Sequence, residues 1–176
     1  PDYVSASRHY HELAGASLLV VDYRGYGWSS GKPLASTMLP DAKAVFDQLP
    51  DVFENAGIDA DVPIFVKGRS LGSAPAIYLG LICAERIVGL IIESGYADAP
   101  SLFRRLGIAI PEDIQQDDTL PIGNAEKIRR VELPLLVIHG EEDQLIPLWH
   151  GKELYTNSPT NNKELVVISG AGHNNL

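Results

Sequence analysis

Short apolar runs alternate with longer stretches of helical periodicity along this chain. The apolar runs have the length of strands and are apolar on both alternating faces, which is typical of strands covered by helices on both sides of a sheet. We expect strands at Leu18–Val21, Ile64–Val66, Val88–Ile92, Leu135–Ile138 and Leu165–Ile168. Apolar residues at steps of three and four predict helices at Val4–Leu13, Leu39–Phe53, Leu71–Cys83 and Trp149–Tyr155. This alternation predicts an α/β fold with a mostly parallel sheet and helices on both faces.

One interval differs from the rest, because no strand is expected between Ser94 and Val131. We interpret residues 1–176 as a single domain with a helical insertion around residues 95–131, over the carboxyl end of the sheet. The insertion is either a long connection or a cap over the substrate. Phe103 and Leu106 are its candidate pocket residues, although packing of a helix against the sheet explains them equally well.

Composition and charge narrow the class of protein. Hydrophobic residues make up 45% and charged residues 21% of the 176 residues, as in an ordinary globular domain. Lys and Arg number 14 against 23 Asp and Glu, a net charge of −9 without a basic run, which disfavours nucleic-acid binding. No apolar run reaches the length of a membrane span. The single cysteine, Cys83, fits a reducing compartment, and we expect a cytoplasmic protein.

The strongest local motif is Gly68-Arg69-Ser70-Leu71-Gly72, which lies between a predicted strand and a predicted helix. In that context a G-x-S-x-G sequence predicts a nucleophile elbow, with the serine on a sharp and strained turn. We expect Gly68 and Gly72 to allow close approach of strand and helix. The helix start favours an oxyanion beside Ser70, with the Leu71 N–H as donor. The alternative is a serine that only caps a buried helix.

A catalytic serine needs a base, and the base needs an orienting acid. Asp143 follows the predicted strand Leu135–Ile138, and His173 follows Leu165–Ile168 in a glycine-rich loop. Ser70, Asp143 and His173 therefore stand in the order serine, acid, histidine, each just after a separate strand. Three independent placements that agree are more specific than any one of them.

Other residues compete for these roles. Glu93 ends another strand and is the next candidate acid, whereas Glu141 and Glu142 are interpreted as solvated loop charges. Among the remaining histidines, we expect His9 and His11 on a helix surface, His139 to pack or bond locally, and His150 to begin a helix near the acid.

No metal or cofactor is predicted. A metal site made of His139, Asp143 and His150 matches no known ligand spacing. The sequence has neither a P-loop nor a dinucleotide-binding glycine pattern in a βαβ context. Cys83 ends a buried helix and is interpreted as a structural thiol.

Together these motifs resemble the α/β-hydrolase superfamily. The resemblance is carried by four blocks in family order, Asp22 to Gly31, Gly68 to Gly72, His139 to Pro147 and Gly170 to Asn174. The first and last blocks are similar to the small α/β-hydrolase-domain branch that includes depalmitoylases and uncharacterised bacterial members. The resemblance implies that Ser70 is the nucleophile, Asp143 the orienting acid and His173 the base.

The sequence departs from this family at both ends. Members carry further strands before the first helix, a loop that supplies a second oxyanion N–H, and a final helix after the histidine. The chain is accordingly expected to be a fragment that lacks the N-terminal strands and the final helix. Leu71 is then its only nameable oxyanion donor, and the second donor is not in this chain.

The function expected from these residues is hydrolysis of an ester or thioester of a small-molecule or acylated substrate, through an acyl-enzyme. Peptidase or acyltransferase activity on the same triad remains open, as does an inactive or binding-only remnant. The oligomeric state is not readable from the sequence.

Overall fold

The computed structural model describes residues 3–105 and 122–176. The chain divides into two compact units, one up to Leu34 and one from Ala35 onward. The expectation of a single domain with a cap-like insertion stays a prediction.

The first unit contains the predicted N-terminal helix but not the predicted first strand. Helix α1 spans Tyr3–Ala14. Leu18–Val21 forms no strand, and Leu19, Val20 and Val21 are 41–50% exposed. The prediction of a strand here is wrong, because an apolar run becomes a strand only where a neighbour takes up its backbone hydrogen bonds, and no described segment pairs with this one.

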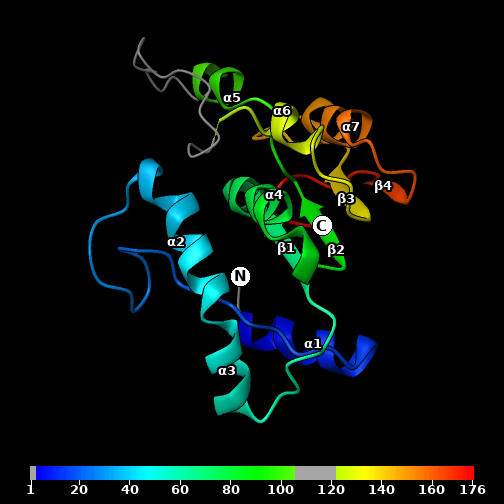
Figure 1. Ribbon diagram of the computed structural model, residues 1–176. Helices are drawn as coiled ribbons and strands as arrows, with labels where there is room; N and C mark the ends of the chain where they lie inside the picture. The colour runs from blue at the N-terminus through cyan, green and yellow to red at the C-terminus, as the bar shows by residue number, and fades with distance from the viewer. Residues whose placement is uncertain (1–2, 106–121) are drawn as a thin grey trace. The chain divides into compact units, whose positions relative to one another are not determined.

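The second unit is built on a four-stranded parallel sheet with the order β1-β2-β3-β4 (Figure 1). The strands are β1 Phe65–Arg69, β2 Gly89–Glu93, β3 Leu135–Gly140 and β4 Lys163–Ile168. The other four predicted strands are thus confirmed, with bounds that differ by at most three residues. The α/β class with a parallel sheet is confirmed as well.

One face of this sheet is covered by helices α4 and α7. The register pairs Val66 with Leu90 and Leu90 with Leu135, so these residues share a face. Gly80 of α4 lies against Leu90, and a Cβ at Gly80 would come 2.7 Å from that side chain. Gly151 of α7 lies equally close to the His139 ring of β3, on the same face.

The helices of the second unit follow the predicted positions with one break. Their bounds are α2 Ala35–Asp47, α3 Leu49–Ala56, α4 Ser73–Ile82, α5 Ala99–Arg105, α6 Asn124–Ile128 and α7 Leu148–Asn157. The helix predicted at Leu39–Phe53 is two helices, α2 and α3. Pro50 explains the break, because it has no N–H for the Phe46 carbonyl and its ring clashes with that group. Two short 3₁₀ turns, Ser70–Gly72 and Ala84–Arg86, flank α4.

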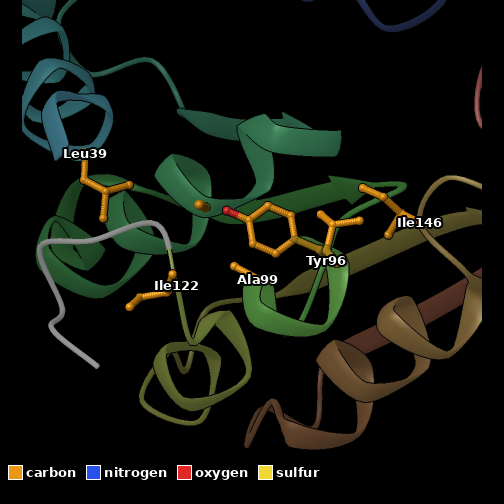
Figure 2. Close-up of a cluster of buried hydrophobic side chains, with 7 residues drawn as sticks. Leu39, Tyr96, Ala99, Ile122 and Ile146 are labelled. Atoms are coloured by element: carbon orange, nitrogen blue, oxygen red, sulfur yellow. The ribbon is translucent and has the colours of Figure 1, made fainter. Parts of the chain in front are cut away.

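A buried apolar cluster brings together residues of α2, α4 and α5 and of the segments that follow β2 and β3. Figure 2 shows the side chains gathered around the ring of Tyr96. The cluster consists of Leu39, Ala74, Tyr96, Ala99, Leu102, Ile122 and Ile146. Burial raises the pKa of the Tyr96 phenol, so this residue is a neutral part of the core.

No helix among the described residues is both long and apolar enough to cross a bilayer.

Candidate active site

Ser70 lies on a strained turn between β1 and α4. Its φ is +52°, a left-handed conformation that non-glycine residues rarely adopt. Gly68 is needed for this geometry, since a Cβ there would lie 2.4 Å from the Gly72 carbonyl oxygen and 2.6 Å from Cβ of Ala76. The same need predicted for Gly72 is wrong, because a Cβ at Gly72 would meet no described atom within 4 Å. The crowding concerns the backbone of Gly72 rather than its missing side chain.

His173 connects this serine to Asp143. Its Nε2 lies 3.0 Å from Ser70 Oγ, and its Nδ1 lies 2.7 Å from Asp143 Oδ2. Because a carboxylate only accepts hydrogen bonds, Nδ1 carries the proton and Nε2 is free to accept the serine hydroxyl. This is the arrangement of a nucleophile, a base and an orienting acid.

Asp143 is held in a loop, residues 141–147, that we call the acid loop. Its side chain is fully buried, whereas that of His173 is 9% exposed. Asp143 Oδ1 accepts the backbone N–H groups of Leu145 at 3.0 Å and Ile146 at 2.8 Å. The other oxygen, Oδ2, is thereby left to face His173.

The acid loop is fastened to β3 by His139. The His139 ring is completely buried, and its Nε2 donates to the Ile146 carbonyl at 2.8 Å. The same nitrogen lies 3.6 Å from Asp143 Oδ2. Local bonding, as predicted for His139, is confirmed, but the target of that bonding is the loop that carries the acid.

Leu71 lies in the first helical turn after Ser70, where backbone N–H groups have no partner within the helix. Its N–H can therefore donate to an oxyanion on a substrate bound at Ser70. The adjacent Leu71 side chain is 49% exposed.

The competing acids are occupied elsewhere. Glu141 and Glu142 are exposed, and Glu141 accepts the Ser169 hydroxyl at 2.6 Å, a bond that lowers the pKa of the Glu141 carboxyl. Glu93 pairs with Lys67 at 2.5 Å and with Arg69 at 3.0 Å. Among these carboxylates, Asp143 is the one whose hydrogen bond to the His173 imidazole is found.

The other predicted residues take structural positions. His9 and His11 are exposed, whereas His150 is buried and accepts the Ala97 N–H at 3.2 Å through Nδ1. Burial lowers the pKa of His150 to about 4, so its ring is neutral. Cys83 is a buried thiol whose pKa is raised by desolvation. The described part of the chain holds no group of three or more His, Cys, Asp or Glu residues placed to bind a metal.

Of the two candidate pocket residues, Phe103 packs against the cluster around Tyr96, and Leu106 lies outside the described residues. Packing therefore accounts for Phe103, and a role in substrate binding stays a prediction.

Arg69 was not singled out by the sequence, although it directly precedes Ser70. Its guanidinium donates to the His173 carbonyl at 2.5 Å and to Asn174 Oδ1 at 2.9 Å. Only its place inside the G-x-S-x-G motif could have drawn attention to it.

The chain is similar to a known protein family, to sequences of that family and to solved structures. A sequence model of the alpha/beta hydrolase fold matches residues 56–176. The alpha/beta hydrolase domain-containing protein aho-3 of Caenorhabditis elegans is 33% identical over 155 residues, which are 88% of this chain and 43% of that protein. The human alpha/beta hydrolase domain-containing protein 17C is 32% identical over 157 residues, again 88% of this chain and 43% of the relative. The chain thus spans less than half the length of these relatives.

Solved structures are similar over most of the chain. Est1E from Butyrivibrio proteoclasticus, solved with ferulic acid bound, superposes with a TM-score of 0.78 at 22% identity, covering 98% of this chain and 75% of that one. The Pyrococcus furiosus esterase Pf2001 gives a TM-score of 0.68 at 22% identity, covering 88% and 61%. At this level of identity the likeness shows the fold.

Proposed function

Because the chain belongs to the α/β hydrolase fold family, we propose that it is a serine hydrolase that cleaves esters or thioesters through an acyl-enzyme. The observation that carries the proposal is the position of His173, which lies within hydrogen-bond distance of both Ser70 Oγ and Asp143 Oδ2. The buried carboxylate of Asp143, the strained turn at Ser70 and the position of the Leu71 N–H in the first helical turn support it.

In the first half of the reaction, Ser70 Oγ attacks the carbonyl carbon while His173 Nε2 takes the hydroxyl proton. The negative charge of the tetrahedral intermediate develops on the former carbonyl oxygen, where the Leu71 N–H can donate. Asp143 stabilises the positive charge that forms on the imidazole. His173 then returns the proton to the leaving alcohol or thiol, and the acyl group stays on Ser70.

In the second half, His173 takes a proton from water, and the hydroxide attacks the acyl carbon. Collapse of this second intermediate releases the acid and restores the serine hydroxyl with the proton from Nε2. An acceptor other than water would give acyl transfer, and an amide substrate would give peptidase activity, on the same residues.

Esters are the substrates to test first, because the similar protein Pf2001 is named an esterase. Est1E was solved with ferulic acid, a carboxylic acid, as would be the acid released from an ester. Thioesters of small or protein-bound acyl groups require the same geometry, since the leaving thiol needs even less help from a proton.

The test is covalent labelling of the purified protein with a fluorophosphonate probe, together with the kinetics of p-nitrophenyl ester cleavage. We expect labelling at Ser70 and a burst of p-nitrophenol equal to the enzyme concentration. Ser70→Ala should abolish both signals, because the nucleophile is lost.

Ser169→Ala is the matched control, since its hydroxyl bonds to the exposed Glu141 and not to His173. It should label and react like the wild type. A folded wild-type protein that is not labelled, or a Ser70→Ala variant labelled as strongly as the wild type, would reject the proposal and favour a binding-only domain.

A further inference from the structure

We infer that Arg69 and Glu93 are positioning residues that hold the backbone of the base, His173, in the triad; this inference rests on the proposed function. The residue inside the nucleophile motif would then have two tasks. It places Ser70 by ending β1, and it fixes the loop that brings the histidine to that serine.

The parallel register brings the two charged residues together. Arg69 pairs with Glu93 across β1 and β2, so the two side chains leave the sheet on the same face. That face is opposite to the one covered by α4, because Gly68, the preceding residue, lies against α4. Arg69 Nε donates to Glu93 Oε1 at 3.0 Å, and Lys67 binds the other oxygen, Oε2, at 2.5 Å. Glu93 is therefore held from two sides, and it fixes the plane of the guanidinium.

The guanidinium in turn reaches the loop of residues 169–175, which we call the histidine loop. Its Nη2 donates to the His173 carbonyl at 2.5 Å and to Asn174 Oδ1 at 2.9 Å. A hydrogen bond from a cation is about twice as strong as one between neutral groups. The hydrogen bond from Arg69 holds the backbone of His173. It therefore also fixes the position of the imidazole that this backbone carries.

The histidine loop needs such a contact because no helix or strand holds it at this point. Residues 169–176 form turns and irregular structure. Upstream, the Ala171 carbonyl accepts the Glu142 N–H at 2.9 Å. At His173 itself, the structure shows a hydrogen bond to the backbone carbonyl from outside the loop, and Arg69 is its donor. A displacement of about 1 Å of a catalytic group can cost up to about 10²-fold in rate.

The decisive experiment measures kcat and KM of Arg69→Ala for a p-nitrophenyl ester, with and without guanidinium chloride at concentrations far below those that unfold proteins. We expect kcat to fall about 10–10²-fold with KM close to wild type, since substrate binding does not use Arg69. Arg69 is partly exposed, with 27% of its side chain accessible, so guanidinium can enter the vacated space. Guanidinium should restore part of kcat in a saturable manner, which a merely structural role would not produce.

Two further variants keep the inference testable if Arg69→Ala does not fold. Arg69→Lys keeps the charge but not the planar fork that bonds Glu93 and His173 together, and Glu93→Gln keeps the shape but not the charge. Both should fold and lower kcat by less than Arg69→Ala does. Arg129→Ala is the matched control, because Arg129 also bridges a glutamate and an asparagine, Glu126 and Asn157, away from the triad. It should keep the wild-type kcat and show no effect of guanidinium.

The outcomes separate this inference from the proposed function. If the wild type is not labelled by the fluorophosphonate probe, the proposed function fails. If the wild type is active and folded Arg69→Ala keeps its kcat, or loses kcat without rescue by guanidinium, the positioning role is rejected. Loss of folding in all three variants of Arg69 and Glu93 would show a purely structural ion pair and would also overturn it.

Discussion

The acid loop and the histidine loop both contribute to the hydrogen bond between Asp143 and His173, yet these two residues are held in different ways. In the acid loop, Asp143 and Ile146 are buried, and the carboxylate is fixed by contacts within a few residues of Asp143. Leu145 and Ile146 donate to the carboxylate, and Ile146 belongs to the apolar cluster around Tyr96. The histidine loop is largely exposed and is fixed by side chains from distant parts of the chain, above all Arg69.

This difference indicates that the two loops meet different requirements, a fixed carboxylate in one and an imidazole that can adjust in the other. A carboxylate that must stay charged and fixed benefits from burial among donors that cannot move away. In the proposed reaction, His173 has to form and release hydrogen bonds with Ser70, the leaving group and water during each cycle. A loop held by side chains at a few points can keep its position and still allow such adjustments.

The largest expected effect is at the hydrogen bond between Asp143 and His173. In Asp143→Asn, the amide oxygen can still accept the Leu145 and Ile146 N–H groups, which leaves the amide NH₂ facing His173. A donor at that place favours the wrong tautomer of the imidazole, and we expect kcat to fall about 10⁴-fold. Ester hydrolysis under saturating substrate measures this loss, and circular dichroism verifies the fold.

Glu142→Gln provides the control for this change, because it neutralises an exposed carboxylate next in the chain. It should keep the wild-type kcat. If Asp143→Asn stayed within about tenfold of the wild type, Asp143 would not be the orienting acid, and the division between the loops would lose its basis.

The anchor of the acid loop should give an intermediate effect. His139→Leu keeps apolar volume against Gly151 but removes the donor to the Ile146 carbonyl, which lies in a buried residue. An unsatisfied buried carbonyl costs about 1–3 kcal/mol, so the free energy of unfolding measured in urea should fall by that amount. We also expect a lower kcat than in the wild type, because Ile146 donates to Asp143.

His11→Leu is the comparison for this variant, since His11 is exposed on α1. Its effect on unfolding should stay within about 0.5 kcal/mol. Equal stability of His139→Leu and the wild type would mean that the acid loop needs no anchor beyond the backbone contacts of Asp143.

The same contrast explains how much could be predicted from the sequence. Four strands were predicted because parallel strands between helices are apolar on both faces. Ser70, Asp143 and His173 were predicted as site residues because each lies in the segment that follows one of these strands. Motifs that depend on neighbouring residues, such as Gly68 before Ser70, are read well from the sequence. The geometry of the triad agrees with that reading.

Features that depend on partners far along the chain were missed or predicted wrongly. Leu18–Val21 has the composition of a strand, but pairing decides whether a strand forms. Arg69 and Glu93 are 24 residues apart in sequence and meet only through the register of β1 and β2. Because this register cannot be read from the sequence, Glu93 was predicted as the next candidate acid. In the structure, its carboxylate binds Lys67 and Arg69. Pro50 is visible in the sequence, but the apolar periodicity continues past it and predicted one helix where the structure has two.

The smallest expected effect concerns Glu141, which ties the two loops together. Its carboxylate accepts the Ser169 hydroxyl and the Gly170 N–H, and these bonds lower its pKa below the ordinary value of 4.5. A group whose pKa is lower in the folded state stabilises the fold above its unfolded pKa, and this contribution is lost as the pH falls through the folded value.

Glu141→Gln should therefore lower Tm slightly at neutral pH, and its Tm should converge with that of the wild type as the pH falls below 4.5. Thermal unfolding followed from pH 7 to pH 3 measures both, with Glu142→Gln as the exposed neighbour that should follow the wild type throughout. A difference between Glu141→Gln and the wild type that persisted undiminished at pH 3 would show that the carboxylate charge does not join the loops, and the histidine loop would then depend on Arg69 alone among these charged contacts.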